Sequence, residues 1–113
     1  MIPQASRTCA RRLRVLADET RLAVMRELLQ GPRGVGELNA AIPVEQSLLS
    51  HHLRVLRDAG LVVTERQGKG VLYRMAPEVG GTLTGGSIDL GCCQLTFPPE
   101  GGSSKRSRGE RRR

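Results

Sequence analysis

Apolar residues in the first part of the chain recur three or four positions apart, which is the spacing of amphipathic helices. Residues 5–16 are expected to form one such helix, and a second is expected to begin after Asp18, a favourable N-cap, and to stop at Gly31-Pro32. The apolar stripes consist of Cys9, Leu13 and Leu16 in the first helix and of Leu22, Met25, Leu28 and Leu29 in the second.

The next two predicted helices are separated by a proline turn. Residues 34–42 carry Val35, Leu38, Ala41 and Ile42, and Pro43 closes this short helix. The following helix begins near Glu45 and runs to about Ala59, with Leu49, Leu53 and Leu56 as its main core stripe. Gly60 stands where a C-terminal glycine cap is preferred.

After Gly60 the pattern changes to that of strands. Residues 61–67 are rich in β-branched residues, and residues 71–75 alternate, with Gly68-Lys69-Gly70 as the tip of a hairpin between them. The order of elements predicts a mainly α fold with a β-hairpin wing, an α+β class. We expect residues 1–79 to form this domain, residues 80–99 a Cys-Cys segment that includes an extended stretch or short strand at 87–97, and residues 100–113 a disordered basic tail.

The charge of the chain is concentrated at its C-terminal end. The 113 residues carry 18 basic and 11 acidic side chains, a net charge of +7. Six basic residues and Glu110 give residues 103–113 a charge of +5, which leaves +2 for the other 102 residues. A basic chain favours a polyanionic partner such as nucleic acid, but here the bulk charge describes the tail. DNA binding therefore has to be argued from motifs.

The N-terminal stretch lacks the apolar centre of a secretory signal, and no run of about 18 apolar residues predicts a membrane span. It is rich in arginine and free of acids until Asp18, as a transit peptide would be, but it continues without a break into a core-facing helix. We expect a cytoplasmic protein that does not bind membranes. Three cysteines, Cys9, Cys92 and Cys93, do not describe a disulfide framework and are expected as free thiols.

Several separated motifs together resemble the ArsR/SmtB family of bacterial metalloregulatory repressors. They are residues 16–22 (LADETRL), residues 35–44 (VGELNAAIPV) and residues 47–62 (SLLSHHLRVLRDAGLV), within a resemblance that covers residues 13–76. The resemblance implies a winged helix-turn-helix homodimer that represses an operon and leaves its double-stranded operator DNA when an inducer binds. DNA binding itself would require no cofactor.

The sequence departs from this family in two places. The family's common Cys-x-Cys inducer site would fall near residues 35–38, where there is no cysteine. Many members also end in a helix that pairs the subunits, whereas this chain has a glycine-rich stretch and a Cys-Cys segment. We expect dimerisation to rest more on the first helix, with the C-terminal segment lying against it.

The helix at 46–59 is expected to enter the major groove with its N-terminal half near the bases. Its candidate DNA-binding residues are Gln46, Ser47, Ser50, His51 and Arg54, and those of the hairpin are Arg66, Lys69 and Arg74. The alternative is a solvated polar face. His51 and His52 are adjacent and point about 100° apart, so they do not suit one metal ion. We leave open whether His52 packs inward or forms a local hydrogen bond.

Cys92 and Cys93 are the most unusual feature, because neighbouring thiolates suit soft ions. The family resemblance suggests trivalent arsenic, which prefers three thiolates. Cys9, expected from the partner subunit, would be the third. Another thiophilic ion (zinc, cadmium or lead), a redox or persulfide switch, and buried cysteines without an inducer role remain alternatives.

Two further function classes are disfavoured. An enzyme such as an arsenate reductase or a small thiol oxidoreductase would use Cys92 and Cys93, but this pair lies late in the chain. No βαβ pattern precedes it and no basic phosphate-cradling loop surrounds it, so we expect no enzymatic activity. A winged-helix interaction module without DNA binding is the other alternative.

Overall fold

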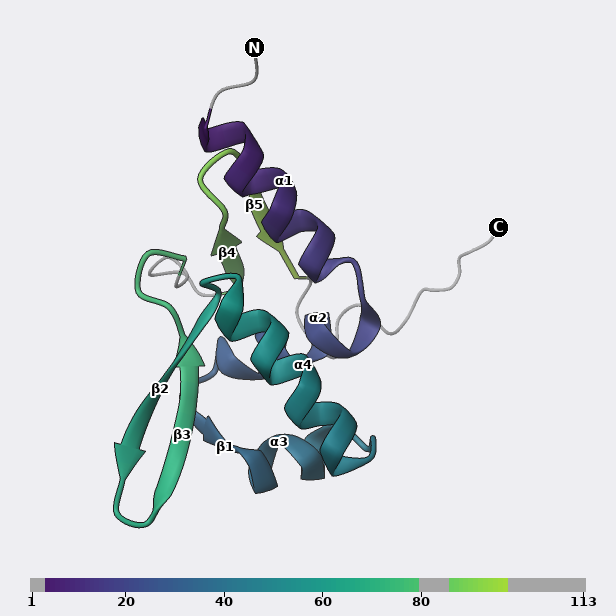
Figure 1. The fold of residues 1–113 in the computed structure, drawn as a ribbon, viewed down its shortest axis with the longest axis vertical. Coiled ribbons are helices and arrows are strands. Elements are labelled where there is room, and N and C mark those ends of the chain that lie inside the picture. Colours follow the sequence, from purple (N-terminus) through teal and green to yellow (C-terminus); the bar gives the residue numbers. More distant parts are fainter. Residues whose placement is uncertain (1–3, 80–85, 98–113) are drawn as a thin grey trace.

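The computed structural model describes residues 4–79 and 86–97. Four helices, α1 (Gln4–Leu16), α2 (Glu19–Leu28), α3 (Val35–Ala41) and α4 (Gln46–Asp58), precede the hairpin of β2 (Val62–Gln67) and β3 (Gly70–Met75). A short strand β1 (Arg33–Gly34) lies before α3, and β4 (Ser87–Asp89) and β5 (Gln94–Thr96) form a second hairpin. In Figure 1, α4 lies between α3 and α1, and the β2–β3 wing extends to one side.

The predicted helix boundaries are confirmed to within a few residues, because local signals set them. The carboxylate of Asp18 accepts a hydrogen bond from the amide of Arg21 at 3.0 Å and so caps α2. At the end of α4, Gly60 has a φ of +77°, a left-handed conformation that glycine adopts without strain. The amide of Leu61 then donates to the carbonyl of Leu56 at 3.0 Å, which completes the helix end.

The wing is part of a three-stranded antiparallel sheet in the order β1-β3-β2. The register pairs Val62 with Met75 and Gln67 with Gly70 across the hairpin. The tip is shorter than expected, because Gly70 belongs to β3 and Gly68, at a φ of +60°, makes the turn with Lys69. The pairing of Arg33 with Tyr73 through β1 was not predicted, since two residues are too few to show a periodicity.

The core lies between the helices and continues under the second hairpin. Leu38, Leu49, Leu53 and Leu56 are fully buried, as their stripe positions predict. Val24, Val79, Ile88 and Leu90 join the same cluster, so residues 86–97 pack on the helical domain. Among the described residues, no helix has the length and apolar character needed to cross a bilayer.

The expected C-terminal segment is thus a hairpin rather than a single extended stretch. The two hairpin strands pair Ser87 with Thr96 and Asp89 with Gln94, and residues 90–93 form the turn between them. The glycine-rich stretch at 80–85 and the basic tail at 100–113 lie outside the described residues. The division of the chain at residues 79 and 99 stays a prediction.

Candidate functional site

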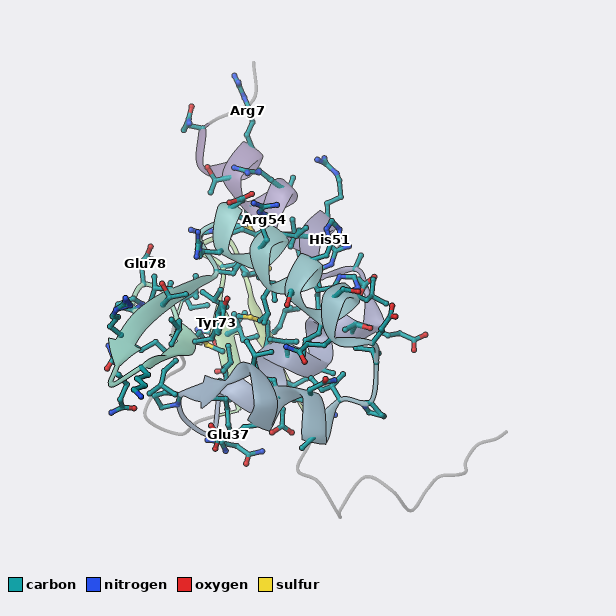
Figure 2. The ribbon with its side chains drawn as sticks, turned by 60° about the horizontal axis from the view of Figure 1, so that its bottom comes forward. Arg7, Glu37, His51, Arg54, Tyr73 and Glu78 are labelled. Carbon is teal, nitrogen blue, oxygen red and sulfur yellow. A yellow bond between two sulfur atoms is a disulfide. The ribbon has the colours of Figure 1, made fainter. Side chains whose placement is uncertain are left out.

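All the residues of α4 that were predicted from the sequence to contact DNA lie on its exposed side. Four positions of the helix, Leu49, His52, Leu53 and Leu56, turn inward. The helical period therefore leaves the polar candidates in solvent: Gln46, Ser47, Ser50, His51 and Arg54 are all exposed. His51 and Arg54 are labelled on this helix in Figure 2.

The two histidines have different environments. His52 is only 8% exposed, and its Nδ1 has no hydrogen-bond partner among the described residues. It therefore packs inward, and the alternative of a local hydrogen bond at Nδ1 is not realised. The His51 and His52 rings lie 5.6 Å apart at 59°, with His51 exposed and His52 buried. Only His51 remains on the exposed polar face.

The turn before α4 is held by a side chain that the sequence analysis missed. Asn39 Nδ2 donates to the carbonyls of Ile42, at 3.1 Å, and Val44, at 2.7 Å, on either side of Pro43. The sequence signal for this interaction was an asparagine placed three and five residues before the two carbonyls that flank Pro43. These two hydrogen bonds hold the turn that joins α3 to α4.

The wing residues Arg66, Lys69 and Arg74 are exposed, as predicted. They differ in charge environment, because Arg74 Nη1 lies 3.2 Å from Glu65 Oε1 on the neighbouring strand. Both side chains of this pair are 45% exposed, so the pair is partly screened by water. Arg66 at the end of β2 and Lys69 at the tip are the better placed cations for a polyanion.

Asp18 is the N-cap of α2, and its carboxylate interacts with Arg21. The amide of Arg21 donates to its carboxylate and is the main reason why the pKa of Asp18 lies below its ordinary value. The nearby charges of His52 and of the Arg21 guanidinium act in the same direction, and partial burial opposes them. Arg21 Nη2 lies 3.6 Å from Asp18 Oδ2.

The β4–β5 turn presents two cysteines. Gly91 has a φ of +98°, and its amide donates to Asp89 Oδ1 at 2.9 Å. The amide of Leu90 donates to the carbonyl of Cys93 at 2.9 Å, which closes the turn. The left-handed glycine turns the chain directly before Cys92, so that the sulfurs of Cys92 and Cys93 lie 3.7 Å apart.

Cys9 completes a cluster of three sulfurs. The Sγ atoms of Cys9, Cys92 and Cys93 all lie within 4.8 Å of one another. Cys9 is buried in α1, whereas Cys92 and Cys93 are exposed. Cys9 and Cys92 are joined as a disulfide, with Cα atoms 6.1 Å apart, so the expectation of three free thiols is wrong for this pair and holds for Cys93. The expected partner-subunit cysteine is not needed, because Cys9 of the same chain occupies this position.

When the Cys9–Cys92 disulfide is reduced, the cluster offers three sulfur ligands and, in the described residues that form it, no imidazole or carboxylate. Such a donor set suits a soft, thiophilic ion and does not suit magnesium or calcium. The exposed side of the cluster gives an ion access from solvent. The same proximity permits thiol–disulfide chemistry between the three sulfurs.

The hairpin that carries Cys92 and Cys93 is anchored at both ends. At its turn, Cys92 is joined to Cys9 of α1. At the far end, Arg26 Cζ of α2 lies 5.5 Å from the centre of the Phe97 ring. The hairpin and the end of α1 line a shared, mainly apolar groove of about 320 Å³. Its lining comprises Leu13, Leu16, Ala17, Leu22, Leu95, Thr96 and Phe97. The C-terminal segment therefore lies against the first helix, as expected.

Comparison with known proteins identifies the helical part of the chain. The family model described as "Bacterial regulatory protein, arsR family" matches residues 18–64. This range includes α2 to the start of β2 and excludes all three cysteines. The similarity therefore covers the exposed face of α4 and leaves the thiol cluster as a separate feature.

Two curated relatives are similar over this region. The chain is 44% identical over 72 residues to the HTH-type transcriptional regulator NmtR of Mycobacterium tuberculosis, covering 64% of this chain and 60% of that protein. It is 40% identical over 67 residues to the arsenical resistance operon repressor of Escherichia coli, covering 58% and 57%. The matches thus span less than two thirds of the length of these relatives.

A solved structure is similar over a larger share. HlyU from Vibrio cholerae N16961 superposes with a TM-score of 0.63 at 35% identity, covering 66% of this chain and 82% of that one. The fold is a winged helix-turn-helix, as the order of elements predicted. On the family match and this degree of similarity, the chain belongs to the arsR family of bacterial regulatory proteins.

Proposed function

We propose that this chain is a transcriptional repressor that binds operator DNA through α4 and the wing and is released when arsenite binds Cys9, Cys92 and Cys93. The observation that carries the proposal is the cluster of three sulfurs within 4.8 Å, built from two ends of a winged helix-turn-helix chain. Chains of this family are regulators, as the names of the relatives state, and a regulator needs an input.

The chemistry of the cluster favours trivalent arsenic as that input. Arsenous acid exchanges its three hydroxyl groups for three thiolates, and each thiol proton leaves with a hydroxyl as water. Sulfur is the preferred donor for soft ions, and the cluster supplies three sulfurs with at least two of them open to solvent. A reducing compartment would keep the Cys9–Cys92 pair as thiols and available for binding.

DNA binding is supported by the surface of α4 and the wing. A helix whose N-terminal half is polar and exposed fits the major groove, where glutamine reads adenine and arginine reads guanine or phosphate. Arg66 and Lys69 suit the phosphate backbone beside it. Release would follow when inducer binding favours an arrangement of the reading helices that no longer fits the operator.

A homodimer would place two copies of α4 in successive major grooves, about 34 Å apart. The apolar groove beside the end of α1 and the 41% exposure of Leu13 support an interface there. Burying Leu13 and the groove against a second copy would remove apolar surface from water, which stabilises a dimer. Cys9 of the thiol cluster lies on the same helix, so inducer binding would act close to this interface.

A gel shift on the promoter of the chain's own operon tests this proposal. The reduced protein should retard the fragment, and arsenite should release it. Zinc and cadmium, added separately, identify the ion if arsenite has no effect. Failure to retard the fragment would argue for a winged-helix module without DNA binding. Retention with every ion and with oxidant would show that the cysteines have no inducer role.

A redox-responsive repressor is a second candidate, favoured by the Cys9–Cys92 disulfide. In this version a peroxide oxidises the two thiols to the disulfide and is itself reduced to water, with the two thiol protons taken up in the products. The Cys93→Ser variant separates the two candidates, because it keeps the pair that forms the disulfide and leaves only two thiolates. In this variant the redox switch predicts release by peroxide, whereas the arsenic sensor predicts release by neither agent.

In wild type, the agent that releases the operator then decides between them. Release by arsenite under reducing conditions supports the arsenic sensor. Release by peroxide alone supports the redox switch. The Cys92→Ser variant serves as the control, because it removes a residue that both chemistries use and should respond to neither agent.

A further inference from the structure

Two consecutive arginines of α1 rest on the C-terminal end of α4. Arg11 Nη2 donates a hydrogen bond to the carbonyl oxygen of Asp58 at 3.3 Å. Arg12 Nη2 lies 3.5 Å from the position that a Cβ on Gly60 would occupy. Figure 1 shows α1 on the side of α4 opposite α3, so these contacts join helices that are distant in sequence.

The end of α4 attracts such groups for a physical reason. The last carbonyls of a helix lack partners within the helix and carry the negative end of its dipole. Asp58 is the last residue of α4, and its carbonyl is one of these groups. A guanidinium there completes the hydrogen bonding that the amides of Gly60 and Leu61 begin. The end of α4 is thus capped in part by α1.

Arg12 is less exposed than its neighbour Arg11. Its side chain is partly buried, and its Nε has no hydrogen-bond acceptor among the described residues. The approach of its Nη2 to Gly60 packs this side chain against the end of α4. Any movement of α1 would therefore be passed to the residues that Arg12 contacts.

Cys9 stands two and three positions before these arginines on the same helix. Cys9 and Arg12 are three positions apart and so lie on one face, which is the face turned toward the rest of the molecule. A change at the Cys9 sulfur that shifts or rotates α1 moves both guanidinium groups with it. The distance along the helix from Cys9 to Arg12 is about 4.5 Å, short enough for the helix to move as a rigid body.

We infer that Arg11 and Arg12 are coupling residues, which transmit the state of the thiol cluster to the C-terminal end of α4. They contact neither the proposed ion nor the exposed polar face at the N-terminal half of α4, and they act by positioning that helix. The biological consequence rests on the proposed function, because the transmitted change matters for DNA only if α4 reads DNA. The mechanical link itself does not depend on the identity of the inducer.

Hydrogen exchange at the amides of Ala59, Gly60 and Leu61 tests the link in the full chain. We compare reduced protein, reduced protein with arsenite, and protein oxidised to the Cys9–Cys92 disulfide, with thiol titration to verify each state. In wild type, constraining the thiols should change the exchange rates at these amides by about fivefold or more, the lower end of typical coupling. The Arg11→Gln, Arg12→Gln double variant should bring this ratio close to one.

Arg7→Gln is the matched control, because it removes the same charge from an exposed position of α1 before Cys9. It should keep the wild-type ratio. Should the double variant fold poorly, Arg11→Gln alone tests the hydrogen bond to Asp58 and should lower the ratio in part. A wild-type ratio near one, or an equal ratio in wild type and in the Arg11 and Arg12 variants, overturns the inference.

Operator release measured on the same samples keeps the two proposals apart. If arsenite changes exchange through Arg11 and Arg12 but does not release DNA, the link stands and the proposed inducer is wrong. If arsenite releases DNA equally from wild type and from the double variant, the proposed function stands and the link is refuted. If the double variant binds the operator and arsenite but is not released, both proposals are supported.

Discussion

The side chains of Cys9 and Cys92, separated by 83 positions in the sequence, meet between α1 and the turn of the β4–β5 hairpin. Neither α1 nor the β4–β5 turn, which carry these two cysteines, touches DNA in the proposed complex. Cys93 lies beside them with its sulfur exposed. The input of the proposed switch is thus formed by the two segments that flank the family-matched region at 18–64.

Arg54 should contribute strongly to operator affinity. It is exposed on the same side of α4 as His51, in the position proposed to contact a base or a phosphate. Arg54→Ala should weaken specific binding by about 1–3 kcal/mol, measured by fluorescence anisotropy with an operator duplex. Arg7→Ala, which removes the same charge from α1, is the control. Equal losses in the two variants would mean that only net charge matters.

Lys69 should contribute through phosphate contact alone. It is exposed at the wing tip. Among the described residues, Arg74 forms an ion pair with Glu65, whereas Lys69 forms none. Lys69→Ala should weaken binding to operator and to unrelated DNA alike, and it should lower the slope of log affinity against log salt by about one. A loss confined to the operator would instead indicate base reading by the wing.

The helices and the exposed polar face of α4 were predictable because they depend on local signals. The period of Leu49, Leu53 and Leu56 fixes which side of α4 is buried, and Asp18 and Gly60 mark helix ends. The β1–β3 pairing, the contact of Arg11 with Asp58 and the meeting of Cys9 with Cys92 in one chain depend on tertiary packing. Sequence spacing contains no information on such contacts, so the partner subunit was expected to supply Cys9.

Gly60 and Gly36 should respond in opposite directions to alanine. Gly60 has a φ of +77°, which a side chain disfavours, so Gly60→Ala should lower the free energy of unfolding by about 1 kcal/mol. Gly36 lies within α3 with no atom within 4 Å of an added Cβ, so Gly36→Ala should raise it by about 0.5–1 kcal/mol. Urea denaturation of the reduced proteins measures both. Stabilisation by Gly60→Ala would contradict the cap.

Asp18 should make folding sensitive to acid. The amide of Arg21, with the nearby charges, lowers the pKa of Asp18 in the folded state. The ionised carboxylate therefore stabilises the fold fully above its unfolded pKa, near 3.8, and this stability is lost as pH falls through the folded pKa. Asp18→Asn keeps a competent cap and removes the ionisation.

The free energy of unfolding, measured from about pH 6 to about pH 2, should fall more steeply in wild type than in the Asp18→Asn variant. The difference should appear at and below pH 4. Glu19→Gln, one residue into α2 and exposed, controls for the loss of a carboxylate at the same helix end. Parallel curves for wild type and Asp18→Asn would show that this carboxylate does not contribute to acid unfolding.

The central claim is that three thiolates control operator binding, and one titration tests it most directly. Operator anisotropy is followed while arsenite is added to reduced wild type and to the Cys9→Ser, Cys92→Ser and Cys93→Ser variants. All four proteins should bind the operator with similar affinity before arsenite is added. Arsenite should weaken wild-type binding by about 5–150-fold and should have little effect on any single variant. Undiminished release from a variant that lacks one of these cysteines would contradict the account.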